Sequence, residues 1–334
     1  MLFVLSFIST LVLTFLIIKY PIAISKPSTR GMHVSSVPTS GGFAILLSFL
    51  TLSIILGFNI YFIILFLFIS FIGLLDDIYN LGKSVRFISQ IILPISLILL
   101  TPVEFVDNYI FLYILIIIAM TYLINVFNFM DGIDTIIVNQ SIFVLLSIYI
   151  LSIDSMLITH DIYNAILLIL YTILGFAVFN ISPAKIFLGN IGSYLIGFVI
   201  SYIYFNIMIS NINYIAPLLI LMTIFIVETL FIIIKRFFSK FSLMKNQNIS
   251  FINAFTEAIS YITEAHCTHN YQIMAKKLNS HSKVNIIILL YNILWCLPLA
   301  YMSLILPNYS IILAIISFLP YIYWCYYNTN ETNE

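Results

Sequence analysis

One short stretch of this chain combines the residue types that hold metal ions and phosphates. It reads Asn125-Val-Phe-Asn128-Phe-Met-Asp131-Gly-Ile-Asp134, with two carboxamides and two carboxylates within ten residues at the end of an apolar run. At helical spacing Asn125, Asn128 and Asp131 share one face, and Gly132 then loosens the turn. Oxygen ligands on one face at a membrane edge suit a hard cation or a phosphate-bearing ligand. A helix end capped by Asn and Asp is the competing interpretation.

A second polar group follows the apolar run 60–75, where Asp76 and Asp77 are adjacent. Neighbouring carboxylates repel each other, and at the C-terminal end of a helix they lie at the unfavourable end of its dipole. Neither effect favours folding, although Lys83 and Arg86 follow within reach. The pair therefore indicates a site for a cation, a phosphate or a proton, with a solvated helix end as the alternative.

Three further features carry weaker signals. The segment Gly189-Asn190-Ile-Gly192-Ser193 opens an apolar run, and backbone N–H groups at such a helix start suit an anion, although small residues also permit close helix packing. His266, His269 and His281 place three of the five histidines within sixteen residues, a weak sign of metal binding. Glu228 lies inside an apolar run, where a carboxylate costs roughly 2.5–3.5 kcal/mol at the bilayer centre, and serves either packing or catalysis.

The elements that must position these residues are membrane helices. The chain has 334 residues, of which 62% are hydrophobic and 8% charged, whereas a soluble domain carries about a quarter charged residues. We therefore expect an all-α polytopic membrane protein with ten to eleven transmembrane helices and active-site loops on the cytoplasmic side. Apolar runs of about 20 residues fall near 1–20, 43–57, 60–75, 87–101, 109–127, 136–153, 163–180, 192–208, 214–234, 285–306 and 309–327.

The distribution of charge predicts the orientation. Threading eleven spans alternately places all thirteen Lys and Arg residues on one side, which the positive-inside rule assigns to the cytoplasm. The N-terminus is then outside, and the first span, which lacks a basic start and a cleavage site, is a retained helix. The net charge of zero gives no indication of nucleic-acid binding. The opposite loops hold only the acids Glu104, Asp107, Asp154 and Asp161.

We expect one transmembrane domain over residues 1–327, followed by a polar tail at 328–334. Its longest cytoplasmic loop, 236–284, contains Phe251, Phe255, Ile259 and Ile262 at spacings of three or four. This pattern predicts an amphipathic helix lying on protein or on the membrane. No function is assigned to the three cysteines, because their spacing fits neither a metal site nor a disulfide.

All the unusual polar groups fall on the predicted cytoplasmic side, at helix ends or in loops. That placement suits a reaction between a lipid headgroup and a soluble phosphorylated donor. Transporters instead place ionisable residues near the membrane midplane, often on broken helices. A transporter is therefore the alternative from a different class.

In this order the motifs resemble the polyprenyl-phosphate N-acetylhexosamine-1-phosphate transferases, a family that includes the phospho-N-acetylmuramoyl-pentapeptide transferase. The histidine segment is closer to the branch that starts O-antigen and capsule-type glycans. The matching features are Arg30…His33, Pro38…Gly41-Gly42, Asp76-Asp77, the Asn125/Asn128/Asp131/Asp134 set, Phe187-Leu-Gly-Asn-Ile-Gly-Ser193 and His266-Cys-Thr-His269-Asn-Tyr-Gln272.

The resemblance implies that undecaprenyl phosphate attacks a UDP-linked N-acetylhexosamine, with Mg²⁺ or Mn²⁺ as cofactor, and that UMP leaves. It places the reaction on the cytoplasmic face of the bacterial plasma membrane, at the start of lipid-linked cell-surface polysaccharide synthesis. The partners it implies are the two substrates, membrane lipid and a second copy of the chain in a homodimer. The residue roles it implies are catalytic for Asp76, Asp77, Asp131 and Asp134, substrate-binding for Lys83, Arg86, Asn125, Gly189, Ser193, His266 and His269, and metal-binding for Asn128 and Asn190.

One position departs from the family pattern, because Asn190 stands where the family has a metal-binding aspartate. Asparagine keeps an oxygen ligand but lacks the negative charge. Three outcomes follow: weaker metal binding with activity kept, compensation by Asp131 or Asp134, or a relative that binds lipid phosphate or nucleotide sugar without turnover. We hypothesise activity, since the other polar positions of the motifs are intact.

Overall fold

The computed structural model describes residues 1–25, 36–100, 110–152, 159–247, 249–262 and 269–331. Within these residues the protein is almost entirely helical, and one antiparallel pair of two-residue strands joins Ile24 to Pro38. The elements are α1 (Leu2–Lys19), β1 (Ile24–Ser25), β2 (Val37–Pro38), α2 (Gly41–Ile55), α3 (Ile60–Tyr79), α4 (Lys83–Leu100), α5 (Ile110–Phe129), α6 (Ile136–Ser152), α7 (His160–Asn180), α8 (Gly189–Ser210), η2 (Ile212–Tyr214), α9 (Ile215–Leu221), α10 (Thr223–Asn246), α11 (Phe251–Ile262), α12 (Asn270–Leu278), α13 (His281–Tyr291), η3 (Asn292–Cys296), α14 (Leu297–Ile305), η4 (Pro307–Tyr309) and α15 (Ser310–Glu331).

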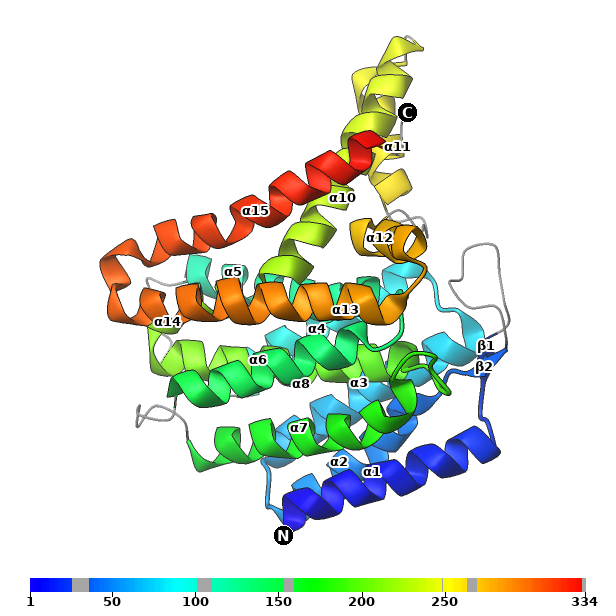
Figure 1. The fold of residues 1–334 in the computed structure, drawn as a ribbon, viewed down its shortest axis with the longest axis vertical. Helices are drawn as coiled ribbons and strands as arrows, with labels where there is room; N and C mark the ends of the chain where they lie inside the picture. Colours follow the sequence, from blue (N-terminus) through cyan, green and yellow to red (C-terminus); the bar gives the residue numbers. More distant parts are fainter. Residues whose placement is uncertain (26–35, 101–109, 153–158, 248, 263–268, 332–334) are drawn as a thin grey trace.

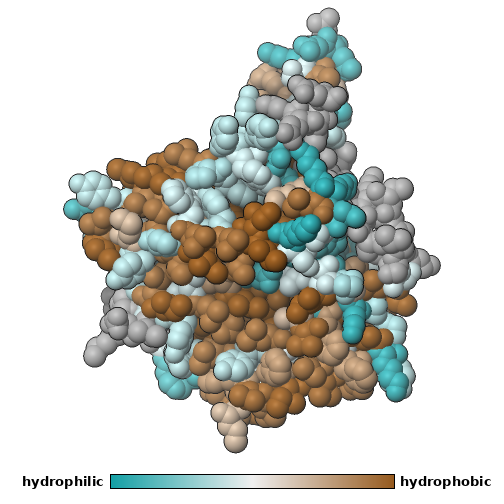
Figure 2. All heavy atoms as spheres, viewed as in Figure 1, coloured by the Kyte–Doolittle hydropathy of each residue, from teal (hydrophilic) through white to brown (hydrophobic). Residues whose placement is uncertain are grey.

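The all-α membrane architecture is confirmed. Eight helices in the described residues are long and apolar enough to cross a membrane, and the bent pair α9–α10 makes a ninth if it counts as one span. The other two predicted ranges correspond to α2 and α6, apolar helices of 15 and 17 residues. The body helices lie side by side in Figure 1. Figure 2 shows apolar residues over much of this body, whereas hydrophilic residues gather near α12 and the far end of α10.

Helix α8 lies at the centre of the body, and most of its residues are buried. It packs against α2, α3, α5, α6 and α7. Glycines bring its N-terminal turn against two neighbours: a side chain at Gly42 of α2 would overlap the Gly192 backbone, and one at Gly73 of α3 would overlap the Ile191 backbone. Backbone approach through small residues is a common way to pack membrane helices. Here it places the end of α3 directly beside the start of α8.

The predicted span 214–234 is corrected, since the chain bends by 72° between α9 and α10. A break frees backbone carbonyls that need other donors inside a membrane. The Leu221 carbonyl accepts a hydrogen bond from Gln140 Nε2 at 2.9 Å, and Gln140 Oε1 accepts one from Asn292 Nδ2 at 2.7 Å. Both side chains are buried. This polar pair stabilises the break and sets the direction in which α10 leaves the body.

The expected loop 236–284 begins differently, because α10 continues as a helix to Asn246. The amphipathic helix is confirmed as α11, and it packs back along α10 to form a hairpin that extends from the body (Figure 1). Phe241 of α10 contacts Phe251 at 5.5 Å between ring centroids, and Phe237 contacts Phe255 at 5.6 Å. These aromatic contacts explain why a segment rich in lysine is helical rather than a loop.

We expect Gly73→Ala to lower the melting temperature of the detergent-purified protein. A Cβ at this position would lie 2.5 Å from Ile191 Cα and 3.0 Å from the Asn190 carbonyl oxygen, and overpacking of this kind costs about 1–3 kcal/mol. The matched control is Gly82→Ala, because a Cβ there meets no atom within 4 Å. An unchanged melting temperature for Gly73→Ala, measured by thermal unfolding, would contradict the close approach of α3 and α8.

Candidate active site

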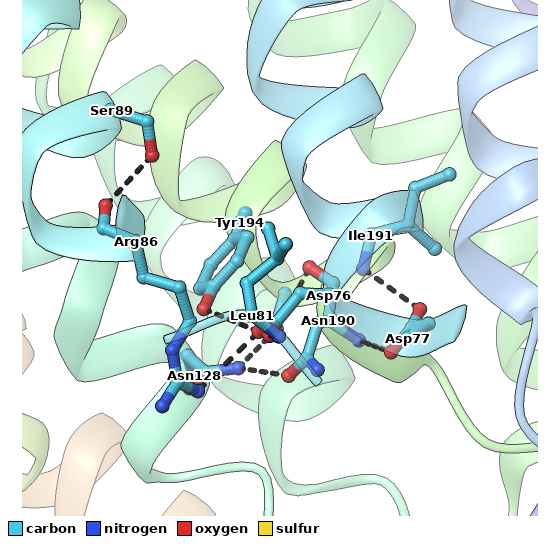
Figure 3. A network of polar contacts seen from close by, with 10 residues as sticks. Asp76, Asp77, Leu81, Arg86, Ser89, Asn128, Asn190, Ile191 and Tyr194 are labelled. Atoms are coloured by element: carbon cyan, nitrogen blue, oxygen red, sulfur yellow. Dashed lines mark hydrogen bonds and ion pairs between the residues drawn. The ribbon is translucent and has the colours of Figure 1, made fainter. Parts of the chain in front are cut away.

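Asp76, in the last turn of α3, is almost completely buried, with 1% of its surface exposed. Its Oδ2 accepts a hydrogen bond from Tyr194 Oη at 3.1 Å and lies 3.4 Å from Arg86 Nη1, and its Oδ1 accepts one from the Leu81 N–H at 2.9 Å (Figure 3). A buried carboxylate needs this kind of pairing to remain charged. Asp76 therefore fixes the Arg86 guanidinium beside the end of α3.

Asp77, the next residue, turns to the start of α8. Its Oδ1 accepts the Asn190 N–H at 2.8 Å and its Oδ2 accepts the Ile191 N–H at 3.2 Å (Figure 3). Gly189, which precedes them, has a φ of +74°, a conformation that glycine adopts readily. The anion expected at this helix N-terminus is thus a side chain of the protein itself. Asp77 caps α8 from another helix and stabilises its first turn through hydrogen bonds and the helix dipole.

The carboxamides of α5 and α8 meet beside this cap. Asn128 Nδ2 donates to Asn190 Oδ1 at 2.7 Å and to Ser193 Oγ at 3.1 Å (Figure 3). The Asn190 side chain also forms a hydrogen bond with the Asp77 carboxylate. An aspartate at position 190 would bring a second negative charge to this contact, whereas asparagine bonds to both of its neighbours. The three predicted residues Asn128, Asn190 and Ser193 therefore form one cluster.

The predicted common face of Asn125, Asn128 and Asp131 is wrong, because α5 ends at Phe129. Asn125 donates to the Thr121 carbonyl of its own helix at 2.8 Å, so its amide does not extend toward Asn190. Asp131 lies in the turn that follows the helix and is exposed. Although it reaches solvent, protein atoms crowd around it, and this environment together with the charges of Asp77 and Asp134 raises its pKa to about 7.

Asp134 joins three segments at the edge of the cluster. Its Oδ2 accepts the Ala184 N–H at 3.2 Å and lies 3.2 Å from His281 Nδ1, and its carbonyl accepts Asn285 Nδ2 at 2.7 Å. Burial opposes its ionisation, but the hydrogen bond from His281 and the other donors outweigh that effect and hold the pKa of Asp134 below its ordinary value. Asp134 thus ties α13 and the α7–α8 connection to the turn that carries Asp131.

Helix α12 brings the histidine segment to the same place. His266 lies outside the described residues, and His269 is the buried residue that precedes α12. A side chain at Gly132 would overlap the Tyr271 hydroxyl and the Gln272 amide, so α12 lies directly against the turn beside Asp131. The glycine therefore permits this contact, which spacing alone does not predict.

One predicted residue lies at the margin, and two contributors are not indicated by the motifs. Lys83 begins α4 and is exposed. Tyr194, the residue after Ser193, carries the hydroxyl that holds Asp76. Asn180, at the end of α7, accepts the Thr135 N–H at 3.0 Å and donates to the Ile186 carbonyl at 2.9 Å. Polar residues at the ends of apolar runs were the available signal for both, but their partners lie far away in the chain.

The donor set fits a magnesium ion that is shared with substrate. No group of three or more His, Cys, Asp or Glu residues able to hold a metal occurs among the described residues. Asp131 and Asn128 supply a carboxylate and an amide oxygen, the ligand types that Mg²⁺ prefers, and Mg²⁺ commonly takes one or two carboxylates plus phosphate oxygens and water. Burial and the neighbouring charges of Asp77 and Asp134 raise the pKa of Asp131, and a divalent cation at such a position would favour the ionised carboxylate.

Comparison with known proteins shows which family the middle part of the chain resembles. Residues 59–209, which include α3, α4, α5, α6, α7 and nearly all of α8, match glycosyl transferase family 4. Over these residues the chain is similar to that family. The matched region contains both aspartates of α3, the Asn128–Asp134 segment and the start of α8, so it covers most of the cluster described above.

Individual relatives agree with this assignment. A Bacillus subtilis protein provisionally named undecaprenyl-phosphate N-acetylglucosaminyl 1-phosphate transferase is 28% identical over 268 residues, covering 71% of this chain and 72% of the relative. The phospho-N-acetylmuramoyl-pentapeptide-transferase of Staphylococcus haemolyticus is 29% identical over 273 residues, covering 69% and 82%. A Saccharolobus solfataricus protein provisionally named UDP-N-acetylglucosamine–dolichyl-phosphate N-acetylglucosaminephosphotransferase is 36% identical over 150 residues, covering 40% and 45%. The chain thus spans less than half of the archaeal relative.

We expect Asp131→Asn to stabilise the protein more at pH 8 than at pH 5, in buffer without divalent cations. Because the folded-state pKa of Asp131 is raised from 3.8 to about 7, the folded state holds a proton between these values that the unfolded state has released. The stability of the unsubstituted protein therefore falls as the pH rises through this window. Thermal unfolding of both proteins at both pH values measures the effect. A difference that is equal at the two pH values, or larger at pH 5, would contradict the raised pKa.

Proposed function

We propose that this protein transfers N-acetylhexosamine 1-phosphate from a UDP-linked sugar to undecaprenyl phosphate, releasing UMP. The observation that carries the proposal is the meeting of α3, α5, α8 and the Asp131 turn at one end of the bundle. Their oxygen-rich cluster, beside one fixed guanidinium, is the chemistry that phosphoryl transfer needs: positioning and charge neutralisation rather than covalent help. The names of the bacterial relatives support the same class of reaction.

In the proposed reaction, an oxygen of the lipid phosphate attacks the sugar-proximal phosphorus of the donor. A new P–O bond forms to the lipid phosphate, the bond to the bridging oxygen breaks, and UMP leaves with that oxygen. Arg86, half-buried and held by Asp76, is placed to bind a phosphate oxygen. Asp76 acts by orienting Arg86, and Asp77 acts by fixing the turn that carries Asn190. A bound Mg²⁺ would supply neutralisation of the diphosphate charge.

The donor side of the site is assigned to the Asp131 turn and the histidine segment. Asp131 is exposed and lies near the carboxylates of Asp77 and Asp134, so it is the proposed carboxylate ligand of Mg²⁺ together with Asn128. Asp134 positions this turn through His281. His269 and His266 are proposed to bind donor phosphates, and Lys83 to attract anionic substrates to the site.

The proposed location is the bacterial plasma membrane, with the site facing the cytoplasm and the N-terminus outside. The one-sided distribution of Lys and Arg supports this orientation. The product would start a lipid-linked cell-surface polysaccharide, such as an O-antigen. A homodimer is proposed as the assembly.

The second candidate is a family member that binds lipid phosphate or nucleotide sugar without turnover. Asn190 favours it, since the cluster then has one carboxylate fewer for a metal. A transporter is less consistent with the structure: although α9 and α10 form a broken helix, the cluster lies at helix ends rather than at that break.

We expect the purified protein to form lipid-linked product from undecaprenyl phosphate and a labelled UDP-N-acetylhexosamine when Mg²⁺ or Mn²⁺ is present. A panel of UDP-sugars in the same assay identifies the donor. Asn190→Asp is expected to lower the Mg²⁺ concentration needed for half-maximal rate, because a carboxylate binds the cation more strongly. No product at any Mg²⁺ or Mn²⁺ concentration, with product appearing only in Asn190→Asp, would establish the non-catalytic alternative for the native chain.

We expect Asp76→Asn and Asn128→Ala each to lower the rate of product formation at least about 100-fold, equivalent to about 2.7 kcal/mol of transition-state stabilisation. The first substitution loosens Arg86, and the second removes the donor to Asn190 and Ser193. Asn206→Ala, near the opposite end of α8, is the matched control, since its amide bonds only within its own helix at Tyr202. A normal rate in either variant, with normal insertion into membranes, would remove that residue from the proposed site.

A further inference from the structure

Glu228 is a buried carboxylate to which the proposed chemistry assigns no part. It lies in α10, and none of its surface is exposed. Its Oε1 accepts the Asn270 N–H and lies 3.5 Å from His269 Nδ1, and its Oε2 accepts Tyr321 Oη at 2.9 Å. The Cys325 thiol also lies 3.6 Å from Oε2. Residues from the start of α12 and from α15 therefore converge on one charge.

The contact with Asn270 is a helix cap supplied from another element. His269 precedes α12, but its side chain makes no capping hydrogen bond to the helix. Glu228 provides that acceptor from α10, at the positive end of the α12 dipole. The same carboxylate oxygen faces the imidazole of His269, which orients the ring.

The opposite side of α12 touches the proposed active site. A Cβ at Gly132 would overlap the Tyr271 hydroxyl and the Gln272 amide, so these two side chains would have to move to admit one. Gly132 follows Asp131 directly, so the position of α12 determines what lies beside that carboxylate. A shift at the Glu228 end of this nine-residue helix would therefore reach the turn.

Helix α10 is itself anchored to α5, the helix that carries Asn128. Tyr122 of α5 donates to the Ile226 carbonyl at 3.2 Å and shares a hydrogen bond with the Thr229 hydroxyl. These contacts lie on either side of Glu228 in the sequence of α10. The contacts form a closed ring: α5 holds α10, Glu228 holds α12, and α12 packs on the turn that follows α5.

We propose that Glu228 is a positioning residue for the donor side of the site. By capping α12 and orienting His269, it holds the His269–Gln272 segment against the Asp131–Gly132 turn, where the UDP-linked sugar would bind. The inference rests on the proposed function. It predicts that the loss of this carboxylate weakens the binding of the donor and has little effect on the lipid acceptor.

The test is Glu228→Gln, because glutamine preserves the volume and an oxygen that accepts the Asn270 N–H but removes the charge that faces His269. We expect the KM for the UDP-sugar to rise about 10-fold, the scale of a lost hydrogen bond to a charged group, with kcat and the acceptor KM within about twofold. Calorimetric binding of the UDP-sugar should weaken by the same factor. Tyr321→Phe is the matched control: it removes the hydroxyl on the other carboxylate oxygen and should leave the donor KM within about twofold.

A second variant approaches the same contact from the turn. Gly132→Ala leaves the Glu228 contacts intact but displaces Tyr271 and Gln272, so it should also raise the donor KM. It keeps the proposal testable if Glu228→Gln does not fold, as judged by thermal unfolding and gel filtration. An unchanged donor KM in a folded Glu228→Gln or in Gly132→Ala, or an equal increase in Tyr321→Phe, would overturn the positioning role. If the unsubstituted protein neither binds nor transfers any UDP-sugar, the proposed function fails and this inference with it.

Discussion

The contact between the Asp77 carboxylate and the first turn of α8 is the constraint on which the rest of the site depends. Two oxygens of one side chain accept two backbone N–H groups that would otherwise be unsatisfied inside an apolar bundle. The contact is possible only because Gly73 lets the backbones of α3 and α8 approach closely. Once this pair is fixed, Asp76 on one side and Asn190 on the other have little freedom of position.

Four aspartates lie near that contact at one end of the bundle, and they differ in how well they are paired. Asp76 is paired with Arg86, Asp77 with a helix terminus, and Asp134 with His281. The pKa of Asp131 is raised to about 7 by burial among protein atoms and by the charges of Asp77 and Asp134. A folded protein stabilises structural carboxylates by pairing them. The one it leaves exposed and poorly paired is therefore the natural candidate for a cation or a substrate.

The break between α9 and α10 determines how α10 and α12 lie beside the Asp131 turn. Gln140 and Asn292 satisfy the carbonyl that the break frees, which allows α10 to leave the body at a steep angle. Because α10 runs in this direction, its Glu228 side chain contacts the start of α12. The break between α9 and α10 and the buried Glu228 carboxylate each cost free energy. Together they place the short helix α12 beside the Asp131 turn.

Composition by itself determined the membrane class and the eleven apolar ranges, and the order of the motifs indicated the resemblance to a family and the candidate residues. They could do so because hydrocarbon requires long apolar helices, and because residues that bind phosphate and metal differ in type from those around them. Only the tertiary structure decided which side chains meet. Sequence could not separate Asp77, which caps a helix, from Asp131, which remains exposed, because both are carboxylates at the end of an apolar run. The difference arises from partners far away in the chain, brought into contact at Gly42, Gly73 and Gly132, where the absence of a side chain lets one backbone or helix lie against another.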